Sequence, residues 1–365
     1  MKRAPLDTPF LLTASLLLAF GLLIFTSAAL GLLARDGATF TSVATSQLLL
    51  GFLMGGVAMV ILSRIDYRTW RPYTPYFFAG AVGLTLLTFV PGIGLELKGA
   101  SRWIEIGPIT FQPEELLKFA SVMFLAALYS SRLREVPTLQ GGLLPFMLIG
   151  GGGAALLLLQ PNTDGAVLLA GACAAVLFAA GGKIRHLALL GILGLMALAI
   201  AALAYPHVMS RFATFFDQDS DLQGAGWQIH QSLIAVGSGE LFGRGFGQSI
   251  EKFSYLPEPI GDSIFAVAAE EFGFIGSGLL VVLYATFALL GLRIAARAPD
   301  PFGGLIVVGL VTLIVVQSFV NIGSVLGLIP LSGLPLIFVS HGGTALAVSL
   351  AEVGVILSVS RRMKS

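Results

Sequence analysis

The sequence is poor in charge, cysteine and histidine, and each shortage excludes a class of protein. Only 11% of the 365 residues are charged and 56% are hydrophobic, whereas roughly 25% charged is usual in a soluble globular domain. The single cysteine, Cys173, excludes an intrachain disulfide, and the four histidines show no metal-ligand spacing. P-loop, CxxC and GxSxG patterns are also missing, so NTPase, redox and hydrolase chemistry have no support. A net charge of +1 argues against a nucleic-acid surface.

What the sequence does have is long apolar runs. A helix of about 20 apolar residues crosses the hydrocarbon core, and lipid favours helices because they satisfy their own backbone hydrogen bonds. The first run is longer than a signal-peptide core and lacks a clear cleavage site, so we treat it as an uncleaved span. We predict an all-α polytopic membrane protein with about ten transmembrane helices, at 9–31, 45–63, 75–91, 113–131, 142–160, 165–181, 186–204, 263–291, 303–325 and 343–360.

The charges predict which side of the membrane each connection occupies. Most of the 21 basic residues fall in alternate connections, and by the positive-inside rule these connections and both termini are cytoplasmic. The acidic residues gather in the other connections, so we expect the functional face to be extracytoplasmic. Residues 1–365 form a single predicted domain with two long outer connections, 92–112 and 205–262. Within the second, residues 227–236 and 246–256 are apolar enough to form short helices at the outer leaflet.

Asp262 closes the long outer connection, and two roles fit it. Aspartate is a favoured N-cap, and this one stands at the start of the predicted span at 263–291. Partial desolvation at the edge of an outer cavity would also adjust the pKa of this carboxylate to suit a general base. The two roles are compatible.

The glycines at 243, 245 and 247 do not match a dinucleotide fingerprint and favour a tight turn.

Several polar side chains fall inside or beside the predicted spans. Glu270 and Glu271 lie two helical turns into their span, so at least one should face a cavity or a cation. Glu115 and Lys118 are i,i+3 neighbours, which predicts either a buried ion pair or, with Arg102, a site for an anionic phosphate group.

Three polar residues elsewhere favour structural roles. Asp164 lies in the QPNTDG turn and is typical of a turn or cap residue. Gln317 and Asn321 share one helix face, as amides that join helices do.

These motifs resemble those of the SEDS family (shape, elongation, division and sporulation), which includes FtsW, RodA and SpoVE, with the FtsW type preferred. GASRWI at 99–104 resembles the family's GAxRWI, and QPEELLK at 112–118 resembles its QPSExxK. Residues 232–273 are similar to the signature loop and 321–346 to the final signature. Two segments depart from the family pattern. QPNTDG stands where QPDxG is usual, and SHGGTA, with His341, stands where SYGGSS is usual.

The resemblance implies a peptidoglycan glycosyltransferase of the bacterial cytoplasmic membrane that polymerises lipid II. The GlcNAc 4-hydroxyl of one molecule would attack C1 of the MurNAc that ends a lipid-linked glycan, invert that carbon and release undecaprenyl pyrophosphate. Asp262 matches the aspartate required for polymerisation, and a carboxylate can accept the hydroxyl proton. The pyrophosphate needs cationic stabilisation. The expected substrate-binding residues are Arg102, Glu115, Lys118, Arg244, Lys252 and Glu258.

The resemblance further implies a monofunctional class B penicillin-binding protein as the partner that cross-links the new strands. We expect no tightly bound cofactor and no protein metal site, with a divalent cation such as Mg²⁺ held mainly by the substrate. Two other functions remain open from the residues alone. Ten spans with internal Glu and Lys would suit a transporter of the lipid-linked precursor, and an inactive scaffold that recruits a transpeptidase would use Asp262 only as a helix cap. A role in division is not distinguished from one in elongation.

Overall fold

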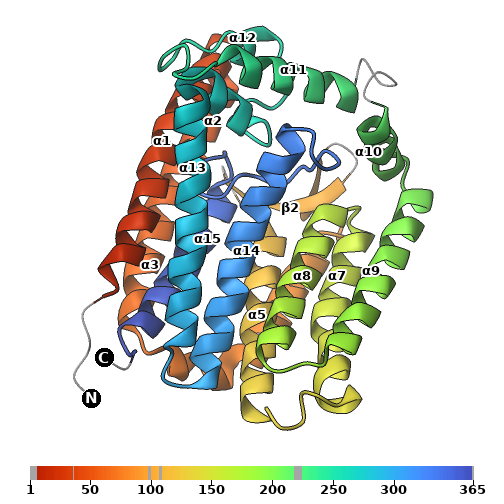
Figure 1. Cartoon of the computed structure of the whole chain (residues 1–365). Coiled ribbons are helices and arrows are strands. Elements are labelled where there is room, and N and C mark those ends of the chain that lie inside the picture. Colours follow the sequence, from red (N-terminus) through yellow and green to blue (C-terminus); the bar gives the residue numbers. More distant parts are fainter. Residues whose placement is uncertain (1–5, 36, 98–99, 107–108, 218–223, 364–365) are drawn as a thin grey trace.

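The computed structural model describes residues 6–35, 37–97, 100–106, 109–217 and 224–363, and most of them are helical. Long helices run side by side in a single bundle (Figure 1). The elements are α1 (Thr8–Arg35), α2 (Gly37–Thr45), η1 (Ser46–Met54), α3 (Gly55–Arg64), η2 (Tyr67–Tyr73), α4 (Thr74–Leu87), β1 (Gly94–Leu97), β2 (Ala100–Ile106), β3 (Ile109–Phe111), α5 (Pro113–Ser131), η3 (Leu139–Leu143), α6 (Leu144–Phe146), η4 (Met147–Gly151), α7 (Gly152–Leu159), α8 (Thr163–Ala179), α9 (Ile184–Ala204), α10 (Pro206–Phe216), α11 (Ala225–Ser238), α12 (Glu251–Ser254), α13 (Ile264–Ala296), α14 (Pro301–Val325) and α15 (Gly343–Ser360).

Each of the ten predicted spans coincides with a helix or with a run of consecutive helices. In the described part of the chain, seven helical stretches are both long and apolar enough to cross a membrane. The remaining three predicted spans are α4 and α8, which are shorter, and α5, which carries Glu114, Glu115 and Lys118. The polytopic helical fold is confirmed. The count of ten spans and the cytoplasmic termini stay predictions.

The long connection 205–262 lies at one end of the bundle. Helices α11 and α12 cover this end, whereas α1 begins and α15 ends at the opposite end (Figure 1). Within the connection, α11 confirms the helix predicted at 227–236, and α10 was not predicted. The second predicted helix is mostly wrong, because only Glu251–Ser254 of residues 246–256 is helical. Three glycines with positive φ, at 243, 245 and 247, keep the preceding segment irregular.

The connection 92–112 forms a small antiparallel sheet, which corrects the all-α prediction for this segment. The strand order is β1-β2-β3, with Gly94 opposite Ile104 in the first pair and Ile104 opposite Phe111 in the second. Within β2, Ile104 is buried and Glu105 is exposed, because successive residues of a strand face opposite sides of the sheet. Sequence reasoning missed this sheet because each strand is short.

Helix α13 is interrupted at Gly273, where φ is 65° and ψ is −167°. The segment 240–245 lies against this break and satisfies the backbone groups that the break exposes. Two of its amides donate to the carbonyls of Glu270 and Glu271 at 2.9 and 3.0 Å, and two amides beyond the break donate back to its carbonyls at 2.9 and 3.1 Å. Lipid would offer these groups no partner, so the irregular backbone is tolerated only because the loop covers it.

Two glycines allow this close approach. A Cβ on Gly273 would lie 2.3 Å from the amide nitrogen of Gly243, and a Cβ on Gly243 would lie 2.1 Å from the carbonyl oxygen of Glu271. Both residues also have positive φ. The turn predicted from the glycine spacing therefore exists, and it serves to dock the loop onto α13.

A substitution at the break tests this account. Gly273→Ala should destabilise the protein by about 1–3 kcal/mol, because its backbone conformation is essentially restricted to glycine and the added methyl meets the loop. Gly278→Ala is the matched control on the same helix, since nothing lies within 4 Å of its Cβ position. Thermal melting of the two purified variants in detergent measures the difference. Equal melting temperatures would contradict the role assigned to Gly273.

Candidate active site

Asp262 lies in a tight turn that leads into α13. The turn begins at Glu258, whose carbonyl accepts hydrogen bonds from the amides of Gly261 at 3.0 Å and Ser263 at 3.3 Å. Glu258 has a φ of 46°, which is uncommon for a residue other than glycine, and its side chain is exposed. Strained backbone of this kind persists where the surroundings enforce it and is frequent at functional sites.

The side chain of Asp262 is half-buried and faces α11. Its Oδ1 accepts from Nε2 of Gln228 at 3.4 Å, and the same amide donates to Oγ of Ser263 at 3.0 Å. The prediction that Asp262 occupies the N-cap position is wrong by one residue, since the cap is Ser263, whose side chain makes no capping hydrogen bond. Asp262 thus lies one residue outside the helix.

Three consecutive carbonyls of this turn are held by the C-terminal part of the chain. The carbonyl of Ile260 accepts from the amide of His341 at 2.7 Å, and that of Gly261 accepts from Oγ of Ser340 at 2.6 Å. The carbonyl of Asp262 accepts from Nδ2 of Asn321 at 2.8 Å. With all three fixed, the backbone beneath the Asp262 carboxylate has little freedom.

His341, which replaces the usual tyrosine of the final signature, lies beside this turn. Its amide holds the turn, while Nε2 of its ring is buried with no hydrogen-bond partner in the described residues. Burial lowers the pKa of the imidazole, and the charge of Glu258 opposes that shift. Burial thus favours the neutral form of the ring.

The amides of α14 extend the support into the bundle. Asn321 also donates to the carbonyl of Leu334 at 2.8 Å, and Nε2 of Gln317 donates to the carbonyl of Pro335 at 3.1 Å. Oε1 of Gln317 accepts from the ammonium of Lys118 at 3.1 Å. We predicted that these two amides join helices. Gln317 does contact α5 through Lys118, and both amides also hold the segment 331–342.

Lys118 and Glu115 form the buried ion pair that was one of the two predicted alternatives. Their side chains are 2.9 Å apart, and 2% and 5% of their surfaces are exposed. A line of polar contacts thus runs from Glu115 through Lys118, Gln317 and the segment 331–342 to the Asp262 turn. Whether Lys118 also contacts a substrate phosphate stays a prediction.

Arg102 projects from β2 onto the end of α7. Its Nε donates to the carbonyl of Gln160 at 3.2 Å, and its Nη2 donates to the carbonyl of Pro161. These are carbonyls at a helix C-terminus, where a cation is favoured. Burial lowers the pKa of the guanidinium, and the charges of Glu114 and Asp164 oppose the shift.

The QPNTDG departure has a structural reason. Nδ2 of Asn162 donates to the buried carboxylate of Glu114, and Oδ1 of Asn162 accepts from the amide of Gly165 at 3.0 Å. An aspartate at this position would place a second carboxylate against Glu114. Asn162 is also the N-cap of α8, so the cap role predicted for Asp164 is wrong. Asp164 instead binds Arg211 of α10 at 2.8 Å and the amide of Gly333 at 3.0 Å.

Lys252 and Arg244 lie against the acidic pair of α13. The ammonium of Lys252 is fully buried and contacts Oε1 of Glu271 at 2.6 Å and Oγ of Ser27 at 2.9 Å. Arg244 is partly exposed, with Nε 3.6 Å from Oε1 of Glu270. The prediction that at least one of these glutamates faces a cation is confirmed. Because Lys252 is enclosed, only Arg244 of this pair remains accessible to an anionic ligand.

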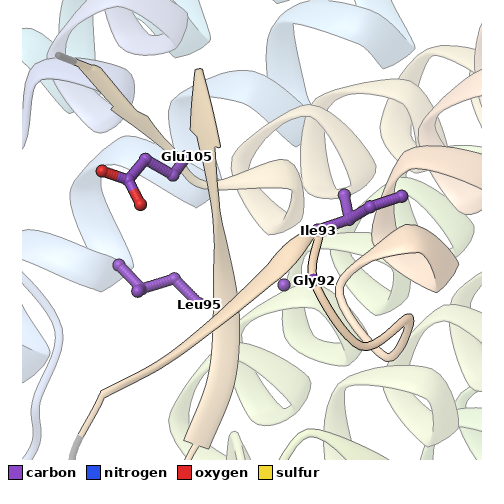
Figure 2. A pocket seen from close by; sticks show the side chains of 5 residues that line it. Gly92, Ile93, Leu95 and Glu105 are labelled. Carbon is purple, nitrogen blue, oxygen red and sulfur yellow. The ribbon is translucent and has the colours of Figure 1, made fainter. Parts of the chain in front are cut away.

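A surface pocket lies elsewhere, beside the small sheet. It has a volume of about 490 Å³ and is lined by Gly92, Ile93, Gly94, Leu95 and Glu105. Figure 2 shows the side chains of Glu105 and Leu95 extending to the same side of the sheet. One carboxylate among backbone and aliphatic atoms offers no partner for a proton transfer, so we place the site at Asp262. No cluster of three or more potential ligands for a metal ion occurs in the described ranges.

Sequence reasoning missed three residues of this region. Gln228 and Ser340 contact the Asp262 turn only because the chain folds back on itself, and nothing local marks them. Glu352 is a single carboxylate inside the apolar helix α15 and is 4% exposed. Its charge inside an apolar run was a usable signal.

Comparison with known proteins agrees with this architecture. The model of the FtsW/RodA/SpoVE family, described as "Cell cycle protein", matches residues 7–365. The chain is 38% identical to stage V sporulation protein E of Bacillus subtilis over 84% of both chains. It is 37% identical to a probable peptidoglycan glycosyltransferase FtsW of a Geobacter species, over 98% of this chain and 97% of that one.

Solved structures give the same result. A chain from a study titled "Structural coordination of polymerization and crosslinking by a peptidoglycan synthase complex" superposes with a TM-score of 0.77, at 26% identity and 98% coverage of both chains. The rod shape determining protein RodA of Thermus thermophilus superposes with a TM-score of 0.70 at 27% identity, covering 99% of this chain and 98% of that one.

Removal of one amide tests how the turn is held. Asn321→Ala leaves the carbonyls of Asp262 and Leu334 without this donor and should destabilise the protein by about 1–3 kcal/mol. Thr312→Ala is the control on the same helix, because its hydroxyl donates only to the carbonyl of Val308, at 2.7 Å. Thermal melting in detergent compares them. If Asn321→Ala melts as high as Thr312→Ala, the amide does not hold the turn.

Proposed function

The chain belongs to the FtsW/RodA/SpoVE family, and from this membership and the site we propose that it polymerises lipid II into glycan strands, releasing undecaprenyl pyrophosphate. It is a multi-pass protein of the bacterial cytoplasmic membrane and a peptidoglycan glycosyltransferase. The reaction takes place at the outer face, in cell division or elongation. The observation that carries the proposal is the half-buried Asp262 carboxylate on a turn with three fixed carbonyls.

Asp262 acts as the general base. The nucleophile is a neutral sugar hydroxyl, whose oxygen attacks C1 of the MurNAc as its proton passes to the carboxylate. The bond from C1 to the pyrophosphate oxygen breaks, and C1 is inverted. Gln228 supports this role, because its amide holds Oδ1 of Asp262 from the α11 side.

The pyrophosphate leaving group carries negative charge and needs nearby cations more than a strong acid. Arg244 is the most accessible of the candidates, and Arg102 and Lys118 lie deeper, on their own partners. Glu258 is exposed four residues before Asp262, where it can contact the sugars. Lys252 and Glu115 contribute by holding Glu271 and Lys118 in place. A divalent cation that accompanies the pyrophosphate would belong to the substrate, whose oxygens suit it.

A transpeptidase partner follows from the same proposal. One of the similar chains comes from a peptidoglycan synthase complex that coordinates polymerization and crosslinking. We assign this chain the polymerising role and a class B penicillin-binding protein the crosslinking role.

The proposal is tested by incubating the purified protein with lipid II, alone and with its transpeptidase, and separating glycan strands on a gel. Asp262→Asn should lower the rate by about 10²–10⁴-fold, the usual contribution of a general base, with an unchanged melting temperature. Glu240→Gln, an exposed acidic residue on the same long connection, should polymerise like the parent.

Two results would contradict the proposal. Polymerisation by a folded Asp262→Asn variant at the parent's rate would remove the general-base role. Transfer of labelled lipid II across proteoliposomes by the parent, with no polymer in either preparation, would favour the transporter.

A further inference from the structure

Glu352 is a buried carboxyl group inside the bundle. It lies on α15 and is 4% exposed. In the part of the chain that the structure describes, no group donates a hydrogen bond to it and no cation lies within ion-pair distance. The mechanism above does not use it, and its apolar helix gives no local reason for a charge.

The face of α15 that carries Glu352 looks toward α5. Thr344, about two turns earlier on α15, contacts the strand and turn that precede α5, through the carbonyl of Thr110 at 3.4 Å and the amide of Gln112 at 3.3 Å. The charged groups that act on Glu352 are Glu115 and Lys118, both on α5. Among the described residues, the other elements that pack on α15 add no charged group to this environment; they are α3, α13, α14, β3, η1 and η2.

Lys118 cannot neutralise both carboxylates. Its ammonium is already bonded to Glu115 at 2.9 Å and to Gln317 at 3.1 Å. An ionised carboxylate buried in the membrane without a partner costs several kcal/mol, and the group avoids that cost by taking up a proton. Because Lys118 neutralises Glu115, Glu352 has no cation to neutralise it and holds a proton instead.

We propose that Glu352 is a positioning residue, held as a neutral carboxylic acid so that Lys118 stays on Glu115 and Gln317. Loss of the proton would create a further anion that acts on Lys118, in competition with Glu115, and draw the ammonium away from Gln317. Gln317 holds the segment 331–342 through the carbonyl of Pro335, and that segment holds the Asp262 turn. The protonation of a residue deep in the bundle would thereby control the placement of the general base.

Infrared spectroscopy tests the proton directly. In lipid bilayers at neutral pH, the spectrum of the parent minus that of Glu352→Gln should contain the carbonyl band of a protonated carboxylic acid. The band should disappear as the pH is raised. If the parent and Glu352→Gln have the same spectrum in this region, Glu352 is ionised and the proposal fails. This measurement needs no substrate.

Activity and stability against pH test the positioning. As the pH rises and Glu352 ionises, polymerisation by the parent should decline, whereas Glu352→Gln, which cannot ionise, should keep its activity. The melting temperature of the parent should fall relative to that of Glu352→Gln at lower pH, from the ordinary titration range of a glutamate up to the pH at which the infrared band disappears, and then level off, because over that interval only the unfolded chain has released the proton. Glu352→Leu is a second variant that cannot ionise, and it serves if the glutamine variant folds poorly.

Parallel pH profiles of melting for the parent and both variants would overturn the positioning role. The activity measurement rests on the proposed function, whereas the infrared and melting measurements do not. An absence of polymer in all variants, together with the expected band and melting profiles, would reject the polymerase and retain the proton on Glu352.

Discussion

The positive charge of Lys118 is buried and therefore needs an anion and hydrogen-bond acceptors as partners. Much of the site is arranged around these partners. Breaking such a buried pair by removing one partner typically costs about 3–5 kcal/mol, so the contacts of Lys118 are strongly constrained. They join α5 to itself through Glu115 and to α14 through Gln317. From α14, two amides fix the segment 331–342 and the carbonyl of Asp262. The general base is thus positioned by a polar line that begins well inside the bundle.

Buried backbone groups likewise need hydrogen-bond partners, and this requirement governs the backbone near the outer end of α13. Helix α13 breaks at Gly273, and the freed backbone groups are bonded to the segment 240–245 instead of facing lipid. Glu270 and Glu271 then attract the following part of the loop through Lys252, Ser249 and two further amides. A long connection without disulfides holds its shape because α13 and the loop supply each other with hydrogen-bond donors and acceptors. Asp262 lies between this docked loop and the segment 331–342, and both sides keep it in place.

The sequence predicted the helices well because apolar length is a strong signal, and each of the ten predicted spans matches a helical stretch. The sheet at 94–111 was missed, since strands this short resemble a loop. The family resemblance located Asp262, but its nearest partners could not be predicted, because Gln228, Asn321 and Ser340 approach it from three distant segments. The family resemblance implied that Lys252 binds substrate, and only the fold shows that its ammonium is buried on Glu271.

The central claim is that the line from Lys118 to Asp262 acts on catalysis through the general base. A double-mutant cycle on the initial rate of lipid II polymerisation tests it, with Gln317→Ala and Asp262→Asn made singly and together. If Gln317 works by positioning Asp262, its substitution should slow the parent and add almost nothing once the carboxylate is gone, since residues that act as a unit are not additive. Multiplicative effects of the two substitutions would contradict the account.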